Sequence, residues 1–331
     1  MPHPIPSEAD LSEVAEVVER VRRSISTVLS GLGPAIDSTL ATVLAEGHVL
    51  MEDVPGVGKT TLARALAASV GTHVGRIQFT PDLLPSDVTG VSVYRADEHT
   101  FEFRPGPVFA HVVIADEINR ASPKTQSALL ESMQEGRVTV DGTTHPLPSP
   151  FLVVATQNPV EMEGTYPLPE AQRDRFMTQV TVGYPSPDHE VAMLDSHDGT
   201  DPLTQVTSVA DTATLARMIG VARRIYAAPA IKQYIVDLMS ATRSDPALRL
   251  GGSPRASLQL LAAAKGRAAM HGRNHVLPDD IKALSGPVLA HRIIPSIEAR
   301  TGGRSPESII AALVAQVPVP SEARTRAARP A

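Results

Sequence analysis

The chain of 331 residues contains no cysteine, no tryptophan and only six Phe and five Tyr. The absence of cysteine excludes disulfides, thiolate zinc sites and thiol catalysis, and it fits a reducing compartment. Few aromatic residues and a formal net charge of −6 argue against a dedicated nucleic-acid binder. No stretch approaches the ~20 apolar residues of a membrane-spanning helix, and nothing resembles a targeting segment. We therefore expect a soluble, cytoplasmic protein without membrane insertion and without a nucleic-acid partner.

Charge is distributed unevenly along the chain. The first 190 residues contain 13 basic and 25 acidic side chains, and the remaining residues contain 17 and 11. The net charge of −6 therefore combines −12 with +6, which indicates two unlike parts. A single hydrophobic core would also be unusual for a chain of this length.

Hydrophobic periodicity divides the chain into four regions. An amphipathic pattern predicts a helix over residues 7–30, capped by Ser7 or Asp10 and ended by Gly31 and Gly33. Short apolar runs then alternate with helical stretches, which predicts an α/β domain with a parallel sheet. The rest of the chain shows only helical periodicity. We expect an N-terminal helix (1–33), an α/β domain (34–186), a smaller all-helical lid domain (187–318) and a flexible tail (319–331).

The α/β region contains two kinds of strand-like segment: apolar runs that predict the strands of the sheet, and two short inserts that predict hairpins. Residues 91–94 and 100–103 flank a polar tip, and the Asp141-Gly142 pair joins two alternating runs. Asp-Gly between alternating runs is typical of a hairpin, so we expect two hairpins, either decorative or functional. The apolar runs predicted as strands are 48–51, 75–79, 112–115, 151–155 and 177–182.

The strongest motif, Glu-Asp-Val-Pro-Gly-Val-Gly-Lys-Thr over residues 52–60, follows a predicted strand and precedes a predicted helix over residues 62–69. Glycines at 56 and 58 let backbone N–H groups close around a polyphosphate, toward which the helix directs its positive end. Lys59 would bridge the β- and γ-phosphates, and the Thr60 hydroxyl would bind Mg²⁺. Asp53 stands where the strict pattern has glycine, at a position that begins the turn without holding phosphate.

Two further strands end in polar residues. The run His-Val-Val-Ile-Ala-Asp-Glu over residues 111–117 is an apolar strand that ends in two carboxylates. Because α/β domains bind ligands at the carboxyl ends of their strands, Asp116 is expected to hold hydrated Mg²⁺ and Glu117 to polarise the attacking water. Another strand ends at Asn158, whose amide could orient that water. The predicted nucleotide-binding residues are Asp53, Val54, Pro55, Gly56, Val57, Gly58, Lys59, Thr60, Thr61 and Asp116.

These residues resemble the AAA+ ATPases, and more closely the MoxR family, over about residues 10–318. The resemblance implies a P-loop AAA+ fold with a helical lid, ATP and Mg²⁺ as cofactors, and the sensor-1 position at Asn158. It also implies that Arg175 is an arginine finger reaching a neighbouring subunit, and that Arg255 is sensor 2, touching the γ-phosphate in its own subunit. Arg173 would be an extra base, and Arg120 would act between subunits. The matching stretches are 52–60, 76–87, 115–126, 155–159, 163–171 and 253–256.

The resemblance further implies a hexameric ring that converts ATP hydrolysis into motion against a client protein. The two hairpins correspond in position to the family's helix-2 insert and pre-sensor-1 hairpin, which face the ring pore. MoxR-like proteins typically act as chaperones that mature metal-cofactor enzymes or complexes, usually with a von Willebrand A domain partner. Two alternatives stay open: a nucleic-acid motor, which charge and aromatic content oppose, and a non-hydrolysing nucleotide switch, which the set of catalytic residues opposes.

One histidine pair has the spacing of a metal site. His271 and His275 are four residues apart, as two ligands on one helix face would be. Gly272 and Asn274 disfavour a helix there, and no third ligand is evident. We therefore expect a surface loop at this position.

Overall fold

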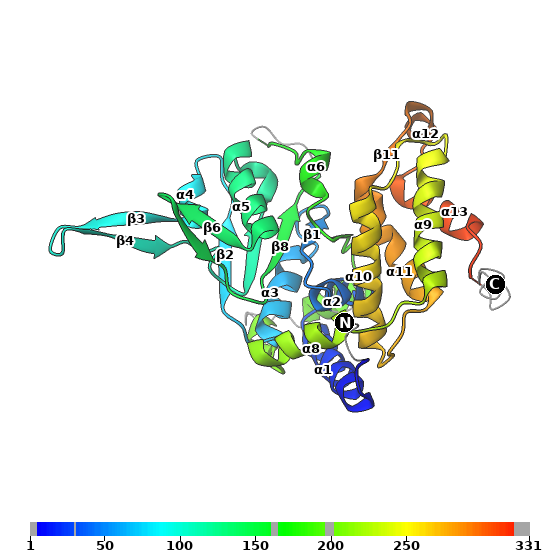
Figure 1. The fold of residues 1–331 in the computed structure, drawn as a ribbon, viewed down its shortest axis with the longest axis horizontal. Coiled ribbons are helices and arrows are strands. Elements are labelled where there is room, and N and C mark those ends of the chain that lie inside the picture. Colours follow the sequence, from blue (N-terminus) through cyan, green and yellow to red (C-terminus); the bar gives the residue numbers. More distant parts are fainter. Residues whose placement is uncertain (1–4, 30, 160–164, 196–201, 321–331) are drawn as a thin grey trace, which may run out of the picture.

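The computed structural model describes residues 5–29, 31–159, 165–195 and 202–320. At the centre of the fold is a five-stranded parallel sheet with the order β2-β5-β8-β1-β9 (Figure 1). Each strand falls on one of the predicted apolar runs, so the parallel α/β domain is confirmed. The strands are β1 (Val49–Glu52), β2 (Val74–Gln78), β5 (Val112–Asp116), β8 (Leu152–Gln157) and β9 (Thr178–Val180).

Both faces of this sheet are buried. The helices around it are α1 (Glu8–Ser26), α2 (Gly33–Leu44), α3 (Lys59–Ser69), α4 (Pro85–Thr89), the 3₁₀ turn η1 (Ile118–Arg120), α5 (Pro123–Glu135) and α6 (Glu170–Arg173). Successive side chains of a strand point to opposite faces. Met51 of β1 accordingly joins a core that includes α1 to α3, whereas Leu50 joins a second core that includes α5. Burial on both sides explains why the inner strands β1, β5 and β8 read as nearly continuous apolar runs, whereas the edge strand β2 alternates buried and exposed residues.

The predicted N-terminal helix is two helices. Its start is as predicted, because Ser7 and Asp10 cap it reciprocally, with each backbone N–H donating to the other's side chain at 3.1 Å. Its end is not, because α1 stops at Ser26 and Gly33 begins α2 instead of ending α1. Pro34 lies in the first turn of α2, where a missing N–H costs no helical hydrogen bond.

Two antiparallel hairpins extend from the α/β domain, as predicted. The first pairs β3 (Gly90–Arg95) with β4 (Thr100–Pro105) and projects away from the body in Figure 1. The second pairs β6 (Arg137–Val140) with β7 (Thr143–Pro146), through a turn in which Asp141 and Gly142 have φ of 49° and 79°. The rings of Phe103 and His145 stack at 3.9 Å between centroids, which couples the two hairpins.

The second part of the chain is a helical lid, as predicted. One feature was not foreseen, a short antiparallel ribbon between β10 (Leu248–Leu250) and β11 (Ile294–Pro295). The boundary at 186/187 stays a prediction, and the part of the predicted tail beyond residue 320 lies outside the described residues. The helical elements are α7 (Pro187–Asp195), η2 (Pro202–Gln205), α8 (Thr212–Arg223), α9 (Pro229–Ser244), α10 (Pro254–Met270), α11 (Pro278–Leu289), η3 (Ala290–Arg292), α12 (Ile297–Thr301) and α13 (Pro306–Gln316).

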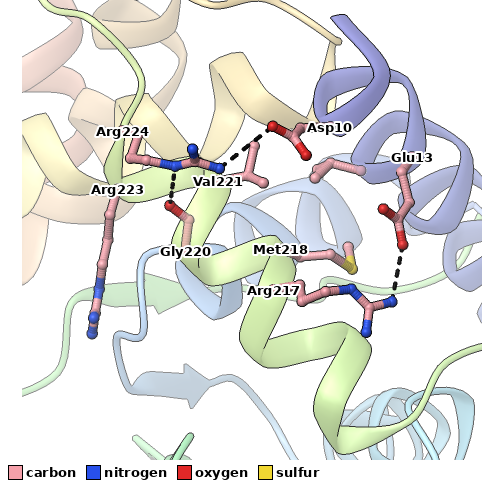
Figure 2. Close-up of a pocket in the computed structure, with 9 residues that line it drawn as sticks. Asp10, Glu13, Arg217, Met218, Gly220, Val221, Arg223 and Arg224 are labelled. Atoms are coloured by element: carbon pink, nitrogen blue, oxygen red, sulfur yellow. Dashed lines mark hydrogen bonds and ion pairs between the residues drawn. The ribbon is translucent and has the colours of Figure 1, made fainter. Parts of the chain in front are cut away.

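Ion pairs join α1 to α8 and the residue that follows it, across a pocket between the two helices (Figure 2). Arg217 lies 3.0 Å from Glu13, and Arg224 lies 3.5 Å from Asp10. Acidic residues of the first part of the chain thus pair with basic residues of the second part. The opposite net charges of the two parts therefore meet within one molecule. Exposed pairs of this kind contribute only about 0–1 kcal/mol each.

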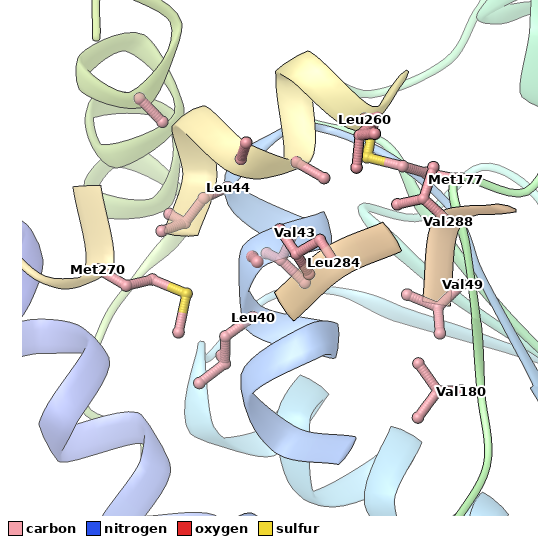
Figure 3. Close-up of a cluster of buried hydrophobic side chains, with 14 of the residues drawn as sticks. Leu40, Val43, Leu44, Val49, Met177, Val180, Leu260, Met270, Leu284 and Val288 are labelled. Carbon is pink, nitrogen blue, oxygen red and sulfur yellow. The ribbon is translucent and has the colours of Figure 1, made fainter. Parts of the chain in front are cut away.

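One hydrophobic core continues from the sheet into the lid (Figure 3). It joins Leu40 of α2 and Val49 of β1 to Leu260 of α10. Helices α2 and α10 approach closely at Gly266, where an added Cβ would lie 2.3 Å from the carbonyl oxygen of Ala41. The lid therefore packs directly on the larger domain through apolar contacts.

The segment from His271 to His275 lies in the connection between α10 and α11, as predicted. Among residues 5–29, 31–159, 165–195 and 202–320, no group of three or more His, Cys, Asp or Glu could hold a metal ion. Within those same ranges, every helix is too short or too polar to cross a bilayer.

Candidate active site

The loop between β1 and α3 has the backbone geometry of a phosphate cradle. Gly56 and Gly58 have φ of 87° and 94°, a region that favours glycine. Helix α3 begins at Lys59, three residues earlier than predicted. Lys59 Nζ donates to Val54 O at 2.8 Å and to Asp53 O, so the ammonium is held within its own loop. Partial burial lowers the pKa of Lys59, and the nearby carboxylates of Asp53 and Glu117 oppose that shift.

Asp53 acts as a backbone anchor at the start of the loop. Its Oδ1 accepts from the N–H of Val54 at 2.7 Å. Its Oδ2 accepts from the N–H groups of Val182 at 3.0 Å and Gly183 at 2.6 Å. The carboxylate thus ties the loop to the chain leaving β9, which is consistent with the expectation that this position does not hold phosphate.

Asp116 ends β5 beside the loop and is almost fully buried. Its Oδ1 accepts from Thr60 Oγ1 at 2.7 Å, and its Oδ2 accepts from Arg76 Nε at 2.9 Å. Buried carboxylate and hydroxyl oxygens are suitable Mg²⁺ ligands beside a polyphosphate. Arg76 has no predicted role in the site, although this residue lies on β2, which pairs with β5.

Glu117 is held in an unusual backbone conformation at the end of β5. Its φ of 56° is uncommon outside glycine, and its N–H donates to Thr156 Oγ1 at 2.9 Å. Its carboxylate accepts from Gln78 Nε2 at 3.2 Å and from Arg120 Nη1 at 2.9 Å. Non-glycine residues in this conformation are found at functional sites, and Gln78 and Arg120 fix where the carboxylate points.

Asn158 follows β8, which lies between β5 and β1 in the sheet. Its backbone oxygen accepts from Asn119 Nδ2 at 3.1 Å. Glu52 of β1 lies in register with Gln157, so Asn158 follows directly at the edge from which the loop begins. The sheet therefore brings the ends of β1, β5 and β8 to one edge, with Lys59, Thr60 and Asp116 around it.

Arg173, the last residue of α6, and Arg175 just after it lie in different surroundings. Burial raises the pKa of Glu52, and the positive charge of nearby Arg173 opposes that rise. Arg175 instead lines a polar groove with Glu131 of α5 and Arg137 of β6. The two arginines thus have different neighbours: Arg173 lies near Glu52 at the end of β1, and Arg175 lines the groove beside α5 and β6.

Arg255 lies in the first turn of α10, whose N-cap Ser253 accepts from the N–H of Ala256 at 3.2 Å. A cation at a helix N-terminus is unfavourable for the helix itself. Its guanidinium lies 3.7 Å from the carboxylate of Asp174, which Arg292 also contacts at 2.8 Å. The sequence reasoning missed Asp174 and Arg292, and no local motif marks either.

Two family models match the chain in the order of its two parts. The description "ATPase family associated with various cellular activities (AAA)" matches residues 48–178, and "AAA lid domain" matches residues 240–313. The fold and the site therefore define an ATPase of the AAA class.

Relatives specify the family further. The Bacillus subtilis protein YeaC is 48% identical over 93% of this chain and 95% of its own length. The chaperone MoxR1 of Mycobacterium tuberculosis is 41% identical over 94% of this chain and 84% of its own. The crystal structure of a candidate ATPase from Cytophaga hutchinsonii superposes with a TM-score of 0.86 at 37% identity, covering 95% of this chain and 98% of that one. The chain belongs to the MoxR family of AAA+ ATPases, as its motifs predicted.

Proposed function

We propose that the protein binds ATP with Mg²⁺ at the carboxyl edge of its sheet and hydrolyses it. The observation that carries this proposal is the 2.7 Å hydrogen bond between Thr60 Oγ1 and Asp116 Oδ1, one residue before Glu117. Thr60 would hold Mg²⁺ directly and Asp116 through water. The metal would neutralise charge on the phosphates.

The other residues of the site have separate roles in this proposal. Gly56 and Gly58 leave backbone N–H groups open to phosphate oxygens, and Lys59 exchanges its loop carbonyls for the β- and γ-phosphates. Glu117, oriented by Gln78 and Arg120, polarises the attacking water. Asn158 orients that water, and Arg255 contacts the γ-phosphate from the lid.

Two substitutions separate binding from turnover. Lys59→Ala removes the cation on the phosphates and should weaken ATP binding about a hundredfold, as loss of a buried charged partner typically does. Glu117→Gln keeps its shape and hydrogen bonds but not its basicity, so ATP binding should persist while kcat falls about a hundredfold or more. Binding is measured with a fluorescent ATP analogue and turnover by phosphate release.

Lys232→Ala and Glu298→Gln, both on exposed lid positions, are the matched controls and should behave like the unaltered protein. Equal turnover by Glu117→Gln would refute the assignment of the water-polarising residue. Unchanged ATP affinity in Lys59→Ala would refute the site itself.

The same proposal includes a hexameric ring that remodels a client protein as a chaperone, together with a von Willebrand A domain partner. It is supported by the relative named as a chaperone and by the first hairpin, which carries exposed aromatic residues in a chain with few of them. The ring of Phe101 is 74% exposed and lies 5.3 Å from that of Tyr94, which is also exposed. These side chains would contact apolar segments of the client.

A mixing experiment tests the ring. The Glu117→Gln subunit offers an intact Arg175 but hydrolyses poorly, and the Arg175→Ala subunit has an intact site but offers no finger. Each alone should be inactive, and the mixture should recover hydrolysis because fingers of the first serve sites of the second. Recovery should coincide with a ring-sized species in the presence of ATP. A monomer under all conditions would exclude a role of Arg175 between subunits.

A further inference from the structure

The backbone on both sides of Arg175 is bound by the buried lid side chain of Arg292, and His291 beside it also contacts the carbonyl oxygen of Phe176, at 3.2 Å. Arg292 Nη2 donates to the carbonyl oxygen of Asp174 at 3.2 Å and to that of Phe176. Arg292 Nη1 donates to the carbonyl oxygen of Met177 at 3.1 Å. The carbonyl groups before and after Arg175 are therefore fixed to η3 of the lid, more than a hundred residues away in sequence.

The charge of Arg292 is compensated within the same contact. Its side chain is 2% exposed, and its Nε donates to Asp174 Oδ1 at 2.8 Å. Burial lowers the pKa of Arg292 to about 10, a shift that Asp174 opposes, so the guanidinium stays charged at neutral pH. A buried ion pair is weak evidence for stability, since apolar residues often replace one at no cost. Its contacts with the backbone around Arg175 offer a positioning role instead.

The second oxygen of Asp174 connects this contact to the nucleotide site. Asp174 Oδ2 faces Arg255 Nε at 3.7 Å, longer than the 2.8 Å contact with Arg292. Arg255 is also 42% exposed, against 2% for Arg292. Arg255 is therefore the partner of Asp174 that a phosphate can remove, while Arg292 stays in place.

We propose that Arg292 and Asp174 are positioning residues that fix Arg175 to the lid and link its placement to Arg255 of the same subunit. The inference rests on the proposed function. When Arg255 contacts ATP, the lid and the segment from Asp174 to Met177 move as one unit. The finger offered to the next subunit therefore depends on the nucleotide state of the subunit that carries it.

The test introduces a substitution into only one of the two subunit types of the mixed ring described above. Arg292→Lys retains the charge but cannot reach the flanking carbonyls together, and it is introduced into the finger-donating Glu117→Gln subunit. ATP hydrolysis by the mixture should fall about ten- to a hundredfold, the loss that small misplacements of catalytic groups cause. The same substitution in the Arg175→Ala subunit should cost about twofold or less, because that subunit donates no finger.

A matched control and a second variant separate positioning from folding. Arg273→Lys, which alters another lid arginine paired with buried Asp280, should leave the donor subunit unaffected. Asp174→Asn in the donor keeps an oxygen for Arg292 but loses the charge that binds it, and should give the same one-sided loss if Arg292→Lys does not fold. Thermal unfolding and fluorescent ATP binding of each donor check folding independently of turnover.

The outcomes are distinguishable. Equal losses from the two placements, or no loss from the donor placement, would overturn the positioning role while leaving the proposed ATPase intact. If the parent mixture itself fails to recover hydrolysis, there is no finger acting between subunits, and both the ring and this inference fall.

Discussion

Acid should destabilise this protein through His48, a half-buried histidine that immediately precedes β1. Its Nδ1 accepts from the N–H of Val153 at 3.0 Å, so Nε2 carries the proton that is donated to the carbonyl oxygen of Met133 at 3.1 Å. The neutral ring thus joins β1 to β8 and to α5. A protonated ring would lose the acceptor that Val153 needs.

The magnitude follows from the pKa difference between the folded and unfolded chain. Burial lowers the pKa of His48 from 6.5 to about 4. Between those values the unfolded chain binds more protons than the folded chain, so stability falls as the pH falls. Lowering the pH from 8 to 5 should cost about 2 kcal/mol from His48 alone. His291, whose pKa burial also lowers, adds a loss of the same sign.

The assay is urea unfolding followed by circular dichroism at pH 8 and pH 5. His48→Gln cannot titrate, and its amide retains a donor for the carbonyl of Met133. It should be less stable than the unaltered protein at pH 8, but its loss between pH 8 and pH 5 should be smaller by about 2 kcal/mol. The same loss in both proteins would show that His48 does not remain neutral in the fold, and would refute the reasoning.

Two further substitutions test the packing of the lid and the anchor of the loop. Gly266→Ala forces a methyl group against the carbonyl of Ala41 and should lower stability by about 1–3 kcal/mol in thermal unfolding. The control is Gly286→Ala, because Gly286 is a helical glycine with open space at its Cβ position. This substitution should be neutral or stabilising. Asp53→Gly restores the strict phosphate-loop pattern but leaves three backbone N–H groups without their acceptor. It should weaken binding of the fluorescent ATP analogue about tenfold, because leaving one buried N–H group without an acceptor costs about 1–3 kcal/mol. Tighter binding would mean that Asp53 does not anchor the loop.

The sequence predicts those parts of the fold in which local pattern and tertiary burial agree. The inner strands β1, β5 and β8 are buried on both faces and produce nearly unbroken apolar runs, and the edge strands β2 and β9 were located as well. Helix α2 escaped prediction because Gly33-Pro34 reads as the end of a helix as readily as the start of one. The ribbon between β10 and β11 escaped because its strands are three and two residues long and pair across more than forty positions. Such short, distant pairings leave no periodic signal.

The same distinction applies to the candidate site. Asp116 ends β5, and Lys59 and Thr60 begin the helix after the loop that leaves β1, so parallel topology brings them to one edge. Arg76 could not be identified, because its contact with Asp116 depends on which strand neighbours β5. Arg292 is harder still, because its partners lie about 118 positions away and its own segment reads as the end of an ordinary lid helix.

The two kinds of contact between lid and larger domain have different consequences for motion. Helix α10 packs on α2 at Gly266 with backbone against backbone, which leaves no room for the helices to slide. Close-packed interiors shift between discrete arrangements more readily than they deform. In the coupling proposed above, the lid would therefore rotate about this contact rather than slide along α2. Polar contacts farther along α10 are then displaced most by a small rotation. Arg255 lies at that far end of α10, in its first turn, which is where the proposed coupling between phosphate and the lid needs the largest displacement.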